Sequence, residues 1–113
     1  MKLQQLRDSL VSTGIPTHHF SADTTNEKYI VWAEEGQAKS GNADNKTIMQ
    51  IIRGTVEYYT KEEFDPNFDI IQNKLNSIDI AWELEDIQFY PETDYIRYLW
   101  TWEMENSLEE VTK

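Results

Sequence analysis

One run of residues, 48–60 (IMQIIRGTVEYYT), constrains the fold of this chain more than any other stretch. It is the longest series of β-branched and aromatic residues, which suit the pleated, half-buried surface of a strand. Asp65 and Pro66 follow it, and these residue types favour the N-cap and the first position of a helix. Apolar residues then recur at helical spacing. The pattern predicts a central strand that leads into a helix over residues 65–78, with Phe64 packed against the start of that helix.

A helix and one or two strands are predicted before this run. Leucines at helical spacing predict an amphipathic helix over residues 2–13, which Gly14 and Pro16 end. Residues 17–22 are β-prone and form either an edge strand or a linker, and residues 29–34 form a strand. The next thirteen residues, up to Thr47, are rich in glycine, serine, asparagine and aspartate and show no hydrophobic period. They are expected to form an exposed, mobile loop.

Two further strands are predicted after the second helix. In residues 80–90 the apolar side chains change phase between Leu84 and Ile87, so we expect a β-bulge or a kink at residues 85–86. Residues 95–105 alternate between apolar and polar side chains more clearly than any other segment, and they form the final strand.

This order of elements predicts an α+β fold with a mostly antiparallel or mixed sheet of four to five strands and two helices packed on one face. The length of 113 residues fits one domain. We assign it to residues 1–105 and interpret residues 106–113 as a flexible acidic tail. Gly54, inside the central strand, indicates either a bulge or a close approach of another backbone.

The charge of the chain excludes some partners. Lysine and arginine number 10 against 21 aspartates and glutamates, which gives a formal net charge of −11. A surface this acidic repels nucleic-acid phosphates and anionic membranes. The sequence has no cysteine, and its N-terminus lacks the apolar segment of a signal peptide. We therefore expect a soluble protein of the cytoplasm that does not bind a membrane.

No catalytic or cofactor motif is evident. Nucleotide-binding glycine motifs, zinc-protease motifs and nucleophile elbows are absent from the sequence. The adjacent carboxylates fit solvated surface better than an acid–base pair. His18 and His19 are neighbours on an extended segment, so their side chains point to opposite faces and are a poor start for a metal site. We expect no enzyme activity, no cofactor and no metal.

The aromatic residues form the remaining candidate site. Three of them alternate along the last strand, and such a row is either a stacking platform for a ligand, part of the core, or a subunit interface. Because helices must cover one face of the sheet, and because the charge disfavours nucleic acid, we favour the core or an interface. The candidates are Trp32, Tyr58, Trp82, Tyr98, Trp100 and Trp102.

Four segments together resemble a known family. They are G-T-V-E-Y-Y-T-K at 54–61, D-x-x-F-D-I-I-x-x-x-L at 65–75, W-E-L-E-D at 82–86 and Y-x-x-Y-x-W-x-W-E at 95–103. This set, with the leucine-rich first helix and the long polar stretch, is similar to the small tail-completion or tail-terminator proteins of long-tailed phages and prophages. The acidic C-terminal end matches no feature of that family.

The resemblance implies a structural protein whose subunits form a ring, commonly of six, at the head–tail joint. Its partners would be other copies of itself, the tail-tube protein and the head-connector protein, and DNA would only pass through the lumen. The protein would reside in the host cytoplasm during assembly and then in the virion tail. By analogy, the polar stretch would line the lumen or contact the next ring, through Glu35, Lys39, Asn42, Asp44 and Lys46.

The charge of −11 supports a different hypothesis, a small acidic inhibitor that mimics DNA and occupies a DNA-binding enzyme of the host. In that case carboxylates such as Glu83, Glu85 and Asp86 would imitate phosphates. Neutralising these three residues would abolish inhibition by a DNA mimic, whereas the assembly of a ring would be left mostly intact.

Overall fold

The computed structural model describes residues 2–23, 26–43 and 46–108 and contains two helices and one five-stranded sheet. The elements follow each other as α1 (Leu3–Val11), β1 (Thr17–His19), β2 (Tyr29–Ala43), β3 (Lys46–Thr60), α2 (Asn67–Asn76), β4 (Ala81–Tyr90) and β5 (Tyr95–Ser107). The order of strands in the sheet is β1-β2-β3-β5-β4.

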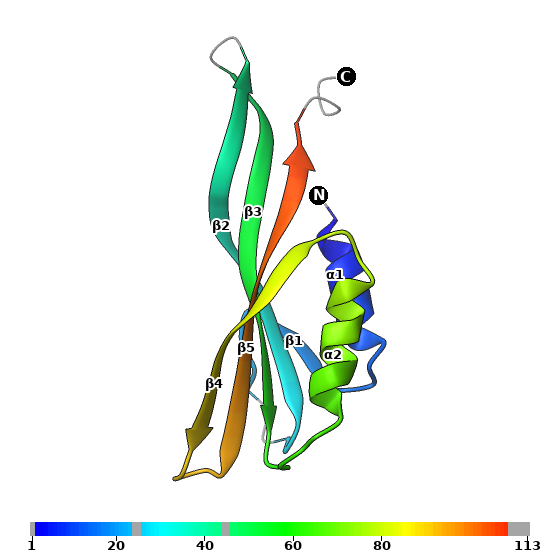
Figure 1. The fold of residues 1–113 in the computed structure, drawn as a ribbon, viewed down its shortest axis with the longest axis vertical. Helices are drawn as coiled ribbons and strands as arrows, with labels where there is room; N and C mark the ends of the chain where they lie inside the picture. The colour runs from blue at the N-terminus through cyan, green and yellow to red at the C-terminus, as the bar shows by residue number, and fades with distance from the viewer. Residues whose placement is uncertain (1, 24–25, 44–45, 109–113) are drawn as a thin grey trace.

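The sheet is mixed, since β1 is parallel to β2 and every other neighbouring pair is antiparallel. Both helices lie side by side on the same side of this sheet (Figure 1). The predicted α+β class, the central position of β3 and the edge position of β1 are therefore confirmed. The last strand continues to Ser107, two residues into the segment that the sequence assigned to the tail.

The core lies between the two helices and the middle of the sheet. Each helix contributes two fully buried residues, Leu6 and Leu10 from α1 and Ile71 and Leu75 from α2. On the sheet side, the largest fully buried side chains are aromatic. Each of them removes about 150–250 Å² from water, a gross gain of roughly 4–6 kcal/mol at about 25 cal/mol per Å². The buried aromatic residues of the sheet are Trp32, Tyr58, Trp100 and Trp102.

These four aromatic residues belong to the core, and the other two candidates lie at its margin. Trp82 and Tyr98 are partly buried and pack against the same cluster. Tyr98 also stacks with Tyr58, with ring centroids 6.2 Å apart, and contacts Phe68 of α2 at 4.7 Å. The alternating aromatic side chains of β5 thus form the surface of the sheet on which α2 packs.

The predicted bulge in β4 is confirmed. Leu84 pairs with Trp100 and Asp86 pairs with Leu99, so that β4 advances by two residues while β5 advances by one. Because a bulge shifts the alternation by one residue, Ile87 regains the side of the sheet that Leu84 faces. The change of phase in the sequence is therefore what keeps the apolar residues of β4 on the helix side.

The prediction of a loop after residue 34 is wrong. Residues 35–43 continue β2, and they pair with β3 through three register shifts, the first of them between Glu34 and Gly36. The physical reason lies in the partner strand, because the β-prone first half of β3 offers a continuous row of backbone donors and acceptors. That row orders a polar segment which has little strand preference of its own.

The two long strands extend beyond the helices as an arm (Figure 1). A strand of 15 residues is about 50 Å long, whereas helices of nine and ten residues are about 15 Å long. The radius of gyration is 16.0 Å, compared with about 13 Å for a compact domain of this length. The helices consequently cover only part of the sheet. We call residues 36–43 and 46–53 the arm.

Candidate functional site

The most buried polar cluster joins the end of β3 to the start of α2. The carboxylate of Asp65 accepts hydrogen bonds from the hydroxyl groups of Tyr58 at 2.6 Å and Thr60 at 2.7 Å. It also accepts the backbone N–H of Asn67 at 2.9 Å, as an N-cap side chain does, which confirms the predicted cap. The ammonium group of Lys28 lies 3.4 Å from the same carboxylate.

The ionisation of this cluster is fixed by its surroundings. Burial alone would raise the pKa of Asp65, but the hydrogen bonds from Tyr58, Asn67 and Thr60 and the charge of Lys28 outweigh it and lower the pKa below the usual 3.8. Burial and the bond to Asp65 raise the pKa of Tyr58 to about 12. Both groups therefore keep one protonation state near pH 7, and the cluster holds β3 and α2 together.

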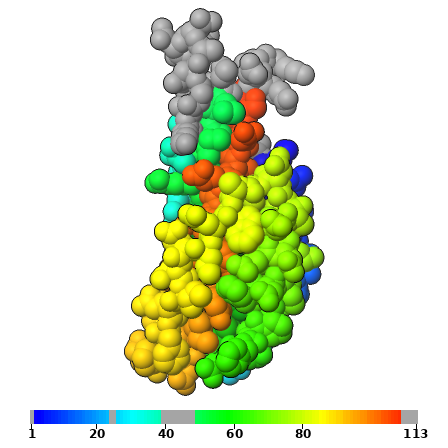
Figure 2. Space-filling view, viewed as in Figure 1, coloured from blue at the N-terminus to red at the C-terminus, as the bar shows by residue number. Residues whose placement is uncertain are grey.

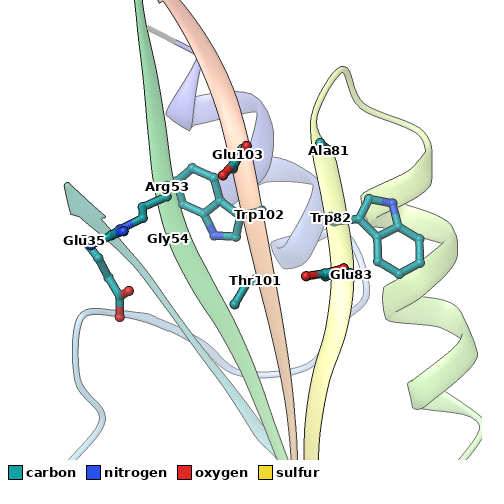
Figure 3. Close-up of a pocket in the computed structure, with 9 residues that line it drawn as sticks. All are labelled: Glu35, Arg53, Gly54, Ala81, Trp82, Glu83, Thr101, Trp102 and Glu103. Atoms are coloured by element: carbon teal, nitrogen blue, oxygen red, sulfur yellow. The ribbon is translucent and has the colours of Figure 1, made fainter. Parts of the chain in front are cut away.

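A small pocket of about 330 Å³ lies where the arm meets the body. Figure 3 shows the guanidinium group of Arg53 extending toward Glu35, and the indole of Trp102 beside Gly54. Glu83 and Glu103 also line the pocket. Three carboxylates and one guanidinium group leave it acidic. Its volume is at the low end of ligand sites.

The two histidines of β1 point to opposite faces of the strand. His19 is stacked at 3.9 Å on both Phe20 and Trp32, and its Nε2 lies 2.5 Å from a carboxylate oxygen of Glu34. His18 pairs with Val31, on the opposite face of the strand. Among the residues that the structure describes, no group of three histidines or carboxylates is arranged to hold a metal ion.

A mostly apolar groove of about 1000 Å³ lies between the β4–β5 hairpin and the start of α2. Figure 2 shows the surface on which β4 and α2 lie next to each other. Four of the lining residues are apolar or aromatic side chains of the two strands, and a fifth comes from the first turn of α2. These groove residues are Ile87, Phe89, Ile96, Tyr98 and Phe68.

Phe64 stands at the rim of the groove and is 95% exposed. The prediction that it packs against the entry of α2 is therefore wrong. Its backbone is left-handed, with φ at +54°, and this conformation is unusual for a bulky residue. Asp94, also at the rim, has φ at +64°. An exposed aromatic side chain on a strained backbone is typical of a binding surface rather than of a structural residue.

We predict that Phe64→Asn stabilises the free protein. Asparagine adopts the left-handed conformation at lower cost than phenylalanine, and almost no buried contact is lost, so the free energy of unfolding should rise by roughly 0.5–1 kcal/mol. Urea denaturation measures this change. The matched control is Phe20→Asn, a second exposed phenylalanine with positive φ (+71°), whose ring stacks on His19. A smaller gain or a loss is expected there, and a loss of stability in Phe64→Asn would contradict the prediction.

The outer strand β4 forms one free edge of the sheet. Its helix-side residues Ile87 and Phe89 are 53% and 55% exposed, and Leu84 is 37% exposed. The side chain of Asp86 points to the opposite face, where Arg97 lies 3.8 Å from it. Uncovered edges with exposed apolar side chains pair readily with another strand. The edge and the groove beside it form one continuous surface.

Of the residues predicted to contact partners, Glu35 lies apart from this surface, and so do the backbones of the others that the structure describes. Glu35 is exposed at the base of the arm and lines the small pocket. The backbones of Lys39 and Asn42 lie in β2, and that of Lys46 begins β3, but their side chains lie outside the described part of the structure. Asp44 is likewise outside the described residues.

Sequence reasoning missed the groove. Ile87 and Phe89 were predicted to lie in a strand without a prediction of which side they face, and Phe64 was predicted to pack against the start of the second helix. The length of the helices would have indicated an uncovered part of the sheet, because two helices of about three turns cannot cover five strands. At least one edge strand with apolar residues therefore had to stay open.

Comparison of the sequence with protein-family models and with curated proteins finds no match. No helix in the described part of the chain is long and apolar enough to cross a membrane.

Proposed function

We propose that this protein is a structural component of an assembly, a ring-forming subunit of the tail-terminator or tail-completion type found at the head–tail joint of long-tailed phages. The observation that carries the proposal is the arm, whose paired strands project beyond the helices that cover the rest of the sheet. Within its own subunit the arm is held by strand pairing, since residues 49–53 of β3 also pair with residues 103–107 of β5, but it projects beyond the helices, and contacts with neighbouring subunits commonly supply the missing cover. The type of assembly is inferred from the resemblance of the four sequence segments to tail-terminator and tail-completion proteins.

The arm would contact adjacent subunits of the ring and the tail-tube protein. The rest of the domain, where the helices cover the sheet, would hold the arms of neighbouring subunits at a fixed spacing. The acidic surface suits a channel through which DNA passes without adhering, since like charges repel. The partners would be other copies of the chain, the tail-tube protein and the head-connector protein. A surface with 21 acidic and 10 basic residues does not favour holding DNA.

Shortening the arm tests this proposal. A variant that replaces residues 40–50 by Asn-Gly joins Lys39 to Ile51, which are paired in the sheet, through a two-residue hairpin turn. We expect its thermal midpoint to stay close to that of the full chain, because the residues of the core cluster lie outside the replaced residues 40–50, while ring formation is lost. Native mass spectrometry and electron microscopy, each with and without purified tail tubes, measure the rings. Val11→Ser, on the exposed side of α1, is the control and should assemble normally.

Tails produced without this protein provide the second test. They should have abnormal length or fail to join heads, and head-joined tails of normal length would refute the proposal. Rings that form with the shortened arm would show that the arm is not the contact.

The DNA-mimic alternative has less support. Glu83 and Glu85 are exposed on β4, but Asp86 is close to Arg97, which also donates a 2.6 Å hydrogen bond to Glu57. The acidic row is thus short and interrupted by a positive charge, whereas a DNA mimic needs an extended row of free carboxylates. Capture of a host nuclease, lost when Glu83, Glu85 and Asp86 are neutralised together, would favour this alternative.

A further inference from the structure

The edge of β4 is shaped to accept another strand. It is ten residues long, and no strand pairs with its outer side among the residues that the structure describes. Proteins usually cover such an edge, shorten it or place lysine and proline on it. β4 carries one further such device, the bulge at Glu85, and yet Leu84, Ile87 and Phe89 remain exposed beside it.

The groove extends this edge on the helix side. A strand paired with β4 would direct every second side chain to that side, over Ile87 and Phe89 and toward the ring of Phe64. Apolar side chains there would fill the groove of about 1000 Å³, which this chain leaves open. A partner that covers Phe64 would explain why its ring is exposed and its backbone is left-handed in the free subunit.

The opposite face of β4 selects the charge of the partner. Glu83 faces away from the helices, since it pairs with Thr101 on that face, and Glu85 is exposed at the bulge. No lysine or arginine lies within 4 Å of either carboxylate in the described part of the chain, and Asp86 shares Arg97 with Glu57. The intervening side chains of an added strand would meet this acidic row, so that lysine or arginine is favoured at those positions.

We propose that β4 binds an extended segment of a partner protein as a sixth strand of the sheet, and that this segment alternates apolar residues with lysine or arginine. Backbone hydrogen bonds to the edge would supply affinity, and the alternating side chains would supply specificity, as in other cases of strand addition. The inference concerns the single subunit and does not depend on the formation of a ring.

A second copy of the same edge is a poor occupant. Two β4 strands paired antiparallel about their middle would place Glu83, Glu85 and Asp86 of one copy near the same residues of the other. Like charges opposite each other destabilise a sheet. The acidic row thus protects the edge from self-association while leaving it open to a basic strand.

A synthetic peptide tests the proposal on the full chain. The probe is Lys-Val-Arg-Ile-Lys-Phe-Arg-Val with a fluorescent label, and its binding is followed by anisotropy at low and high salt. We expect saturable binding that weakens with salt, and at least about tenfold weaker binding when glutamate replaces every lysine and arginine. Equal binding of the basic and the acidic peptide would overturn the charge argument.

Two N-methylated peptides test the strand geometry. One carries N-methyl groups on the even residues and the other on the odd residues, so that only one of them blocks the N–H groups that face β4. One peptide should bind and the other should not, and hydrogen exchange of the β4 amides should slow only in the first complex. Binding of both, or unchanged exchange at β4, would refute strand addition and indicate docking in the groove without backbone pairing.

Matched variants locate the surface. Ile87→Asp and Val11→Asp change two aliphatic residues that are each 53% exposed, the first on β4 and the second on α1. We expect at least a tenfold loss of peptide affinity in the first and none in the second, with similar circular dichroism spectra. Equal losses would overturn the proposal, and so would a β4-paired dimer of the free protein in native mass spectrometry. A chain that binds the peptide but forms no ring would refute only the proposed function.

Discussion

Gly54→Ala should destabilise the protein by about 3 kcal/mol or more, the largest effect expected for the loss or gain of one methyl group in this chain. A Cβ atom at this position would lie 2.1 Å from the carbonyl oxygen of Ala33 and 2.3 Å from the Cζ2 atom of Trp102. Neither neighbour can move easily. Ala33 is fixed in the β2 ladder, and Trp102 is 1% exposed and donates its indole N–H to the carbonyl of Thr55 at 3.1 Å.

The effect should appear as a lower urea midpoint with an unchanged slope, and as a thermal midpoint lowered by roughly 15 °C for a domain of this size. Gly14→Ala is the matched control. A Cβ atom there meets nothing within 4 Å, although φ is +81°, so that the cost is only that of a left-handed alanine, about 1 kcal/mol. If both variants lose the same stability, the close approach at Gly54 is not what demands glycine.

Asp65→Ala should have an effect of similar size, about 3–4 kcal/mol. The substitution removes the cap of α2 and leaves the hydroxyl groups of Tyr58 and Thr60 buried without their acceptor. It also removes one carboxylate from the pair beside Lys28, which keeps its 2.7 Å contact with Glu62. Asp69→Asn, in the exposed first turn of the same helix, should change stability by only about 0.5 kcal/mol.

The contribution of Asp65 depends on pH in a direction that its surroundings determine. Its pKa in the folded protein is lower than the ordinary 3.8, so the unfolded chain binds the proton more readily. The stabilisation is complete above the unfolded-state pKa and is lost as the pH falls through the folded-state pKa. The difference in unfolding free energy between the native chain and Asp65→Asn should therefore be constant near pH 7 and shrink below about pH 4. A difference that stays constant down to pH 2 would contradict this assignment.

Much of the fold followed from local patterns. The run at 48–60 identified the central strand because β-branched and aromatic residues suit a strand that is paired along both edges and packed against helices on one face. The change of phase at Glu85 identified the bulge, since a period of two residues cannot otherwise continue on one face. Gly54 predicted either a bulge or a close approach of another backbone. The close approach is that of Ala33, and a bulge lies in the facing strand β2, after Glu34.

The arm and the groove could not be predicted in the same way. The polar part of β2 is ordered by its partner strand, which is a contact between segments and leaves no local hydrophobic pattern. Phe64 has the composition and position of a residue that packs on a helix start, but the left-handed turn at φ +54° directs its ring into solvent. Exposure of a single apolar residue depends on the path of the backbone, and the sequence around Phe64 is compatible with either outcome.

The register shifts along β2 have a consequence for how such molecules can be joined. Each shift adds twist and interrupts the even spacing of donors and acceptors along the outer margin of that strand, beyond the point where β1 ends. The sheet therefore has two unlike margins, one at β4 with a single interruption, the bulge at Glu85, and one at β2 with three. The spacing of donors and acceptors on the β4 margin of one copy does not match the spacing on the β2 margin of the next, so that repeated joining of copies margin to margin is disfavoured. The same interruptions thus oppose growth of the sheet into a fibre.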